Sequence, residues 1–505
     1  MAEPSNHTAK RRLIRGCRAL LGPKAEVSGP LDVVIEDGRI AALAPAGTLE
    51  APDIIEATNC LLTAGLINGH FHSHEHFQKG RFENLPLELW MNYVRPPRPV
   101  PMSTRQVYLR TMVGAIEALR SGTTTVIDDM NLGASLDRAH LAAVHQAYKD
   151  IGLRALVGIS MMDRRFFEAL PFVEEEFEPD LLAELRAIPI ASGAQLLDLA
   201  RELATLRHPS RHRVGFIVSP SAPQRCTTQF LRDARALADE FDLPAMIHVQ
   251  ETRLQVVTGL LTNGKTFVEH LHEIGFLRPN TSLIHGVWLT PHEVELIAES
   301  GATVQLNPWS NLRLGSGVAP FRALLDAGVN VSLGTDGCSS TDTCNMLHSL
   351  GLAAALQTLR GEPEAWVTAG EAFAAATLGG AKAIGRGDDL GAIEVGRVAD
   401  FTLFRLDTIP FVPLNDPLKQ LVYAERGSSI DTVFVDGEIV MRGGTLVQVD
   451  EAALLAEIAE EYRTLEPQFT AAERTVGRMQ PALQRIHQRC QCHPIPEAGF
   501  HARLS

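Results

Sequence analysis

Apolar and polar positions along the middle of the chain alternate between two periods. Eight short apolar or β-branched runs are typical of buried strands, and stretches with the 3.6-residue period of a helix separate most of them. The runs lie at residues 65–70, 123–127, 154–159, 214–218, 245–249, 282–285, 303–306 and 330–333. Strands that alternate with helices predict a parallel sheet in an α/β protein, and eight such units favour a closed (β/α)8 TIM barrel. A doubly wound open sheet is the alternative, but no glycine-rich nucleotide motif follows the first long strand.

Two of the helices carry clear start signals. Ser103 and Gln106 form a capping box, in which each side chain can satisfy a free backbone N–H at the helix start. Thr290 opens a second helix with Pro291 at its first position, and Gly301 follows its predicted end.

Both ends of the chain are rich in strand signals. Residues 31–35 and 39–42 flank the turn Asp37-Gly38, and residues 399–404 and 432–435 are followed by the turn Asp436-Gly437. Two β-rich segments around a long middle predict one small β-sandwich domain built from both ends. We therefore divide the chain into residues 1–62 and 389–450 for the sandwich, 63–388 for the barrel and 451–505 for a helical C-terminal extension.

Two segments are longer than a minimal barrel needs. Residues 80–101 are rich in proline and contain Trp90, while residues 164–213 form a charged and predominantly helical insertion between the third and fourth strands. Connections of this length often serve as lids or interfaces.

Composition and charge narrow the class of partner. The chain has 505 residues and a net charge of −14, so neither nucleic acid nor an anionic membrane is expected as a partner. It contains seven cysteines, too few for a disulfide scaffold. No apolar run approaches the ~20 residues of a membrane span, and the basic cluster near the start lacks the apolar stretch of a signal peptide. We expect a cytoplasmic enzyme that acts on a small molecule.

Several predicted strands end in residue types that bind metal ions. His70 and His72 lie two positions apart at the first strand and can face one ion together. His248, His285 and Asp336 close the fifth, sixth and eighth strands. Because catalytic groups of such barrels lie at the carboxyl ends of strands, we expect these side chains to meet. Imidazole and carboxylate suit Zn²⁺, and Fe²⁺ or Mn²⁺ can use the same set.

Six segments give the chain a specific resemblance. They are residues 65–72 (GLINGHFH), 248–252 (HVQET), 283–289 (LIHGVWL), 307–317 (NPWSNLRLGSG), 334–337 (GTDG) and 390–400 (LGAIEVGRVAD). Together they resemble the amidohydrolase superfamily, in its cytosine deaminase-like and triazine hydrolase-like branch. The resemblance spans nearly the whole chain, and its relatives are usually homodimers or larger homo-oligomers.

The resemblance implies roles for the residues at the strand ends. His70, His72, His248 and Asp336 would hold one divalent metal ion, with Zn²⁺ favoured over Fe²⁺ or Mn²⁺. Asp336 and His285 would accept a proton from the attacking water and orient it. Glu251 would carry a proton to the leaving nitrogen, which is general acid–base work.

Other residues point to the substrate. We expect Trp90, Gln224, Asn307 and Trp309 to line its pocket. Relatives that act on adenosine-like compounds carry a histidine about where Ser221 stands, which disfavours a nucleoside substrate. His74 and His76 extend the first motif, but loop histidines outside the site are the more common case. The pair Cys490 and Cys492 in the tail lacks the second pair of ligands that a zinc site needs.

The sequence therefore predicts a metal-dependent hydrolase that cleaves a carbon–nitrogen bond of a small, cyclic or aromatic nitrogenous compound. Deamination, with release of ammonia or an amine, is the first hypothesis. Hydrolysis of a urea, carbamate or anilide is the alternative, and displacement of chloride from a triazine is a further variant. An inactive scaffold is the remaining class, but scaffolds of this kind usually lose metal ligands, and here all are present.

Overall fold

The computed structural model describes residues 11–496. All eight predicted core strands are present in it, each within a few residues of its predicted bounds. They are β7 (Leu66–Phe71), β8 (Thr123–Asp129), β9 (Arg154–Gly158), β10 (Val214–Phe216), β11 (Ala245–Val249), β12 (Thr281–His285), β13 (Thr303–Leu306) and β14 (Asn330–Leu333). Nearly every position in them is buried, as expected for strands covered on both faces.

These strands pair in parallel as two sheets. Within residues 11–496, the orders are β10-β9-β8-β7 and β11-β12-β13-β14. An isolated parallel bridge from Val218 to Ala245 joins the two sheets on one side. On the other side the amide of Asp336 donates to the carbonyl of His70 over 2.9 Å. The α/β architecture with parallel strands is confirmed, whereas full closure into a barrel stays a prediction.

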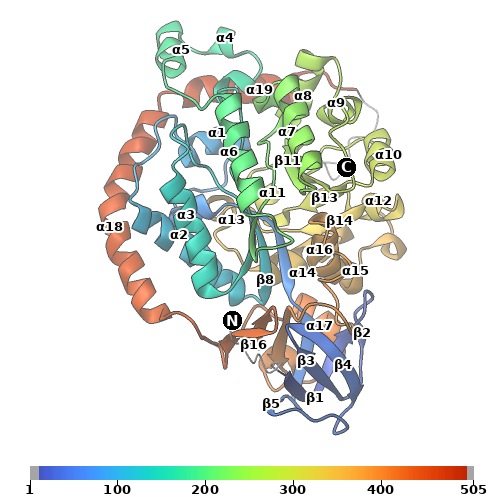
Figure 1. Cartoon of the computed structure of the whole chain (residues 1–505). Coiled ribbons are helices and arrows are strands. Elements are labelled where there is room, and N and C mark those ends of the chain that lie inside the picture. Colours follow the sequence, from blue (N-terminus) through green and yellow to red (C-terminus); the bar gives the residue numbers. More distant parts are fainter. Residues whose placement is uncertain (1–10, 497–505) are drawn as a thin grey trace.

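Helices surround these strands (Figure 1). They are α1 (Leu87–Val94), α2 (Thr104–Leu119), α3 (Arg138–Ile151), α4 (Val173–Glu176), α5 (Pro179–Arg186), α6 (Gly193–Leu206), α7 (Thr228–Glu240), α8 (Arg253–Asn263), α9 (Phe267–Glu273), α10 (Pro291–Ser300), α11 (Pro308–Arg313), α12 (Phe321–Asp326), α13 (Cys338–Thr341), α14 (Met346–Leu356), α15 (Ala369–Ala374), α16 (Gly380–Ala383) and α17 (Pro417–Tyr423). The predicted capping box of Ser103 and Gln106 is present on α2, and Thr290 begins α10 as predicted, where it forms a capping box with Glu293. Gly301 ends α10 in the left-handed conformation, as its position predicts.

Strands from both ends of the chain join in one further sheet. Within residues 11–496, this ten-stranded sheet follows the order β18-β17-β16-β15-β6-β1-β3-β4, with β2 and β5 paired to β1. Its members are β1 (Arg11–Leu21), β2 (Glu26–Val27), β3 (Leu31–Glu36), β4 (Arg39–Pro45), β5 (Asp53–Glu56), β6 (Cys60–Ala64), β15 (Phe401–Arg405), β16 (Ile430–Val435), β17 (Glu438–Arg442) and β18 (Thr445–Leu446). The antiparallel pair β6–β15 joins the two halves. The predicted sandwich form of this domain stays a prediction.

A buried ion-pair network fixes this sheet against the core strands. Arg154 at the start of β9 donates to both carboxylate oxygens of Asp400, at 2.9 and 3.2 Å, and also pairs with Asp436. The side chains of Arg154 and Asp400 are only 5% and 3% exposed. Arg213 pairs with Asp436 from a more exposed position.

The two predicted long segments and the tail form a cover around the core strands. The insertion contains α4, α5 and α6, and the proline-rich segment contains α1. The tail forms α18 (Glu451–Val476), which contacts α2, and α19 (Gln480–Cys492), which contacts α1, α4 and α8. Figure 1 shows α18 along one flank and α19 beside α8 and the insertion. None of the described helices is long and apolar enough to cross a membrane.

Candidate active site

The histidines and the aspartate predicted as metal ligands meet at the carboxyl ends of their strands. His70 lies in β7, His72 directly follows it, and His248 lies in β11. Asp336 follows β14, and all four side chains are buried. A pair of hydrogen bonds between the Asn68 side chain and Thr335, at 2.8 and 3.1 Å, holds the Asp336 loop against β7.

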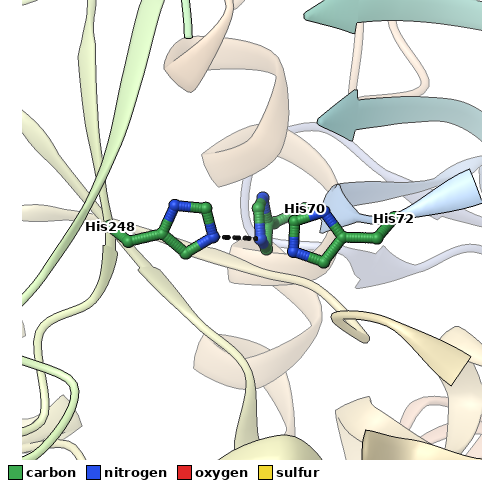
Figure 2. Close-up of side chains that lie close together, drawn as sticks. All are labelled: His70, His72 and His248. Atoms are coloured by element: carbon green, nitrogen blue, oxygen red, sulfur yellow. Dashed lines mark hydrogen bonds between the residues drawn. The ribbon is translucent and has the colours of Figure 1, made fainter. Parts of the chain in front are cut away.

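The ring nitrogens converge on one point (Figure 2). The Nε2 atoms of His70 and His248 are 3.1 Å apart. Oδ1 of Asp336 lies 3.3 Å from Nε2 of His72 and 3.7 Å from Nε2 of His70. Donor atoms that each lie about 2.0–2.2 Å from one Zn²⁺ are separated by roughly these distances.

Hydrogen bonds orient two of the three converging histidines. Nδ1–H of His72 donates to the carbonyl of Asp129 over 2.7 Å, and Nδ1–H of His248 donates to the carbonyl of Ser221 over 2.6 Å. Each bond places the proton on Nδ1 and leaves a lone pair on Nε2, which is the usual arrangement of metal-binding histidines. Burial also lowers the pKa of His70 and His248 well below the ordinary value, so both rings are neutral. The residues therefore fit a divalent cation.

Asp336 also belongs to a second group, which it forms with Glu251 and His285. Nδ1–H of His285 donates to Oδ1 of Asn311 over 2.9 Å. Its Nε2 is then 3.5 Å from Oε2 of Glu251 and 3.7 Å from Oδ2 of Asp336. Burial raises the pKa of Glu251 to about 7, and its Oε1 has no hydrogen-bond partner within the described part of the chain. A carboxyl group with this pKa can both give and take a proton near neutral pH.

The backbone is strained where two of these residues lie. His285 and Asp336 have φ values of +77° and +66°, in the left-handed region that side chains other than glycine rarely adopt. Such conformations cost of order 1–3 kcal/mol each and concentrate at functional sites. Here they turn both side chains from the strand ends toward the shared centre.

The four residues predicted to contact substrate differ in their surroundings. Gln224 and Trp309 each hold a buried polar atom, Oε1 and Nε1, that has no partner among the described residues. Asn307 is buried, with Nδ2 3.5 Å from Nδ1 of His285. Trp90 instead packs in an apolar cluster with residues of α1, and its Nε1–H donates to the carbonyl of Ser339 over 3.1 Å.

A cavity of about 660 Å³ lies next to the histidine cluster. His74 lines it, and the ring of His74 is 5.2 Å from the ring of His72. Arg95 and Ser160 also line it, and Arg95 donates to Ser160 Oγ over 3.3 Å. This volume suits a small molecule.

His76 and the tail cysteines Cys490 and Cys492 lie outside the proposed metal centre. His76 turns away from the centre toward Cys344, with 3.5 Å between its Nε2 and Sγ. Cys344 in turn lies 3.0 Å from Cys338, sulfur to sulfur. In the tail, Cys490 is buried against α8 and Cys492 is exposed, and neither belongs to a metal-binding group of the described residues.

Sequence reasoning missed the residues that orient the ligands. Asp129 is the last residue of β8, so the rule that strand ends carry function would have found it. Arg95 and Arg225 line the cavity from a loop and from a short helix, and no periodicity marks them. Asn311, the partner of His285, lies in the segment 307–317, whose motif does not indicate this role.

Comparison with known proteins identifies a family and relatives of this chain. Residues 61–440 match the profile of the amidohydrolase family. A 5-methylthioadenosine/S-adenosylhomocysteine deaminase from Pyrococcus furiosus is 34% identical over 424 residues, covering 84% of this chain and 94% of the relative. A 5'-deoxyadenosine deaminase from Methanothermobacter thermautotrophicus is 33% identical over 448 residues, covering 87% and 96%.

Two solved structures have the same fold. An adenosine deaminase from Xanthomonas campestris with bound zinc has a TM-score of 0.79 at 28% identity, covering 90% of this chain and 98% of the other. The atrazine chlorohydrolase of Arthrobacter aurescens in complex with zinc has a TM-score of 0.81 at 25% identity, covering 89% and 100%.

The chain belongs to the amidohydrolase family, whose members are metal-dependent. It is an enzyme that hydrolyses a carbon–nitrogen bond of a small molecule.

Proposed function

We propose that the protein is a zinc-dependent deaminase that releases ammonia from an aminated heterocycle. The observation that carries this proposal is the convergence of three imidazole side chains and the Asp336 carboxylate, with Glu251 and His285 beside them. His70, His72, His248 and Asp336 would hold one Zn²⁺ per chain, with Fe²⁺ or Mn²⁺ as alternatives. The zinc in the two solved relatives supports this choice of metal.

Asp336 and His285 act on the attacking water in the proposed deamination. A bound divalent cation acts as a Lewis acid and lowers the pKa of water. Oδ2 of Asp336 accepts a proton from the attacking water, and Nε2 of His285, 3.7 Å away, orients that water. Glu251, His285 and Asp336 lie within the buried part of the chain, so bulk water competes little with these contacts.

Glu251 moves the proton that the leaving group needs. An amide anion is a poor leaving group, so the nitrogen must be protonated before the carbon–nitrogen bond breaks. Glu251 faces Nε2 of His285 through Oε2 and keeps Oε1 without a partner among the described residues. Its raised pKa lets it take a proton at the water side and release it at the nitrogen.

Ammonia release over a substrate panel tests this function. Metal-loaded protein is incubated with aminated purines, pyrimidines and triazines, and with ureas, carbamates, anilides and chlorotriazines. Ammonia from at least one aminated heterocycle, at a rate well above the others, is the expected result. Release of an amine from anilides or ureas alone, or of chloride from triazines alone, would contradict deamination and favour the alternatives.

We also propose the larger architecture predicted from the sequence. The Val218–Ala245 bridge and the Asp336–His70 hydrogen bond support one closed barrel over residues 63–388. The ten-stranded sheet supports one domain from residues 1–62 and 389–450, folded as a sandwich. We assign residues 451–505 to the extension; residues 1–10 and 497–505 lie outside the described part of the chain. We expect a cytoplasmic homodimer or larger homo-oligomer.

A further inference from the structure

The cavity beside the metal centre has an unusual charge. None of the described residues that line it is Asp or Glu, although the whole chain carries a net charge of −14. Six of its lining residues are arginines: Arg95, Arg98, Arg110, Arg164, Arg165 and Arg225. A cavity whose described charged lining residues are all arginines attracts an anion.

Arg225 is the most deeply buried of the arginines that line this cavity. It is 4% exposed, and no ion pair forms on it within residues 11–496. Its Nη1–H donates to Ser221 Oγ over 3.1 Å, its guanidinium lies 4.7 Å from the centre of the Phe166 ring, and its Nε has no partner among the described residues. A buried charge without a counter-ion is costly, and the missing partner marks a place for a ligand anion.

Arg95 adds a second cation to the same cavity. Its Nε–H donates to Nε2 of His74 over 3.1 Å. Burial and the positive charge of Arg95 together lower the pKa of Arg225 to about 10, while Glu251 and Asp129 act on it in the opposite direction without forming ion pairs with it. Arg95 and Arg225 therefore line the same cavity, and none of its described lining residues is a carboxylate.

Ser221 connects this cation pair to the reaction centre. Its hydroxyl accepts from Arg225, while its backbone carbonyl accepts from Nδ1 of His248. Ser221 is therefore the one residue that links a ligand group bound by Arg225 to the proposed metal ligand His248. The site departs here from adenosine-type relatives, in which we expect histidine where Ser221 stands.

We propose that the substrate is an aminated heterocycle that carries a carboxylate, and that Arg225 and Arg95 bind this carboxylate. The inference rests on the proposed function, because it names the substrate class of the same site. The planar fork of arginine matches the two oxygens of a carboxylate. Apolar walls that include Met130, Ile159 and Phe166 suit a flat ring beside the charged group. An α-amino acid group fits poorly, since its ammonium would find no acidic lining residue.

Matched acids and amides test the inference without turnover. Binding to the metal-loaded protein is measured by calorimetry for benzoate against benzamide, and for hypoxanthine-9-acetate against hypoxanthine-9-acetamide. We expect each acid to bind at least ~10-fold more tightly than its amide, as for charge-assisted bidentate pairs. Arg225→Gln and Arg95→Gln each remove most of this preference, and Arg164→Gln, at an exposed position of the same cavity, keeps it.

The outcomes separate this inference from the proposed function. Equal binding of acid and amide, no measurable binding of either acid, or a preference that survives in both variants overturns the inference. If Arg225→Gln fails to fold by circular dichroism, Arg95→Gln alone decides. A carboxylate preference without ammonia release from any aminated heterocycle supports the anion site and contradicts the deaminase. Ammonia release without a carboxylate preference supports the deaminase and contradicts the anion site.

Discussion

At the scale of single residues, hydrogen bonds decide which atoms face the reaction. His72, His248 and His285 each donate the Nδ1–H to an oxygen and direct Nε2 toward the centre. Glu251 and Asp336 then approach His285 from two sides, at 3.5 and 3.7 Å. Because the oxygens that orient the rings come from neighbouring strand ends, the centre depends on how several strands align.

Replacement of Glu251 tests its role in proton transfer. We expect Glu251→Gln to lower kcat by at least ~10²-fold, the scale of general acid–base catalysis, because the amide cannot donate the required proton. Metal content stays unchanged, since Glu251 lies outside the proposed ligand set. The measurement is ammonia release with metal analysis on the same sample, and exposed Glu295→Gln is the control. Turnover close to wild type would remove Glu251 from the mechanism.

The proposed ligands could be predicted because they follow strong strand signals. His70 and His248 stand at the ends of apolar runs, where a barrel gathers its chemistry. Arg225 could not be found in this way, because it lies in a short helix without periodicity, and its lack of an ion pair among the described residues is visible only in three dimensions. Trp90 lies in an apolar cluster with other residues of α1, and its contact with substrate stays a prediction.

At the scale of elements, the core strands were predictable and the cover around them was not. Strands buried on both faces are continuous apolar runs, so β7 to β14 stand out in the sequence. The insertion and tail contact the core mainly through their own helices, whose docking depends on surfaces distant in sequence. The helix α19 is the clearest case: His487 reaches Glu88 on α1 over 3.1 Å, and Glu88 accepts from Thr252, the neighbour of Glu251.

Loss of apolar contact should detach α19. Leu483 is fully buried in a cluster that includes Leu254 and Val257 of α8. We expect Leu483→Ala to weaken docking by about 2 kcal/mol or more, which corresponds to a ~30-fold faster proteolysis of this helix if it opens locally. Gln484→Ala, on the exposed face of the same helix, is the control. Equal protease resistance of the two variants would show that α19 is held by other contacts.

At the scale of the whole molecule, two structural units are joined by a few buried charges. Arg154 comes from a core strand, whereas Asp400 and Asp436 come from the segments that return the chain to the ten-stranded sheet. Such a network is not a large source of net stability, but removal of one partner leaves buried charges unpaired.

Removal of Arg154 should therefore destabilise the protein strongly. We expect Arg154→Met to cost about 3–5 kcal/mol, because Asp400 stays buried without its partner. Arg213→Met is the matched control, since Arg213 pairs with Asp436 but its side chain is 34% exposed, and we expect a loss of at most ~1 kcal/mol. Calorimetric unfolding of both variants provides the comparison. A similar shift in Tm for the two would contradict the importance of the buried network.

The metal content of purified protein tests the central claim most directly. Elemental analysis of the wild type, His248→Ala and the exposed control His292→Ala is made on folded, dialysed samples. We expect about one divalent transition-metal ion per chain in the wild type and the control, and a large loss in His248→Ala, because a site with one of its four ligands removed holds zinc weakly. A folded wild type without metal, or His248→Ala with full metal content, would contradict the site.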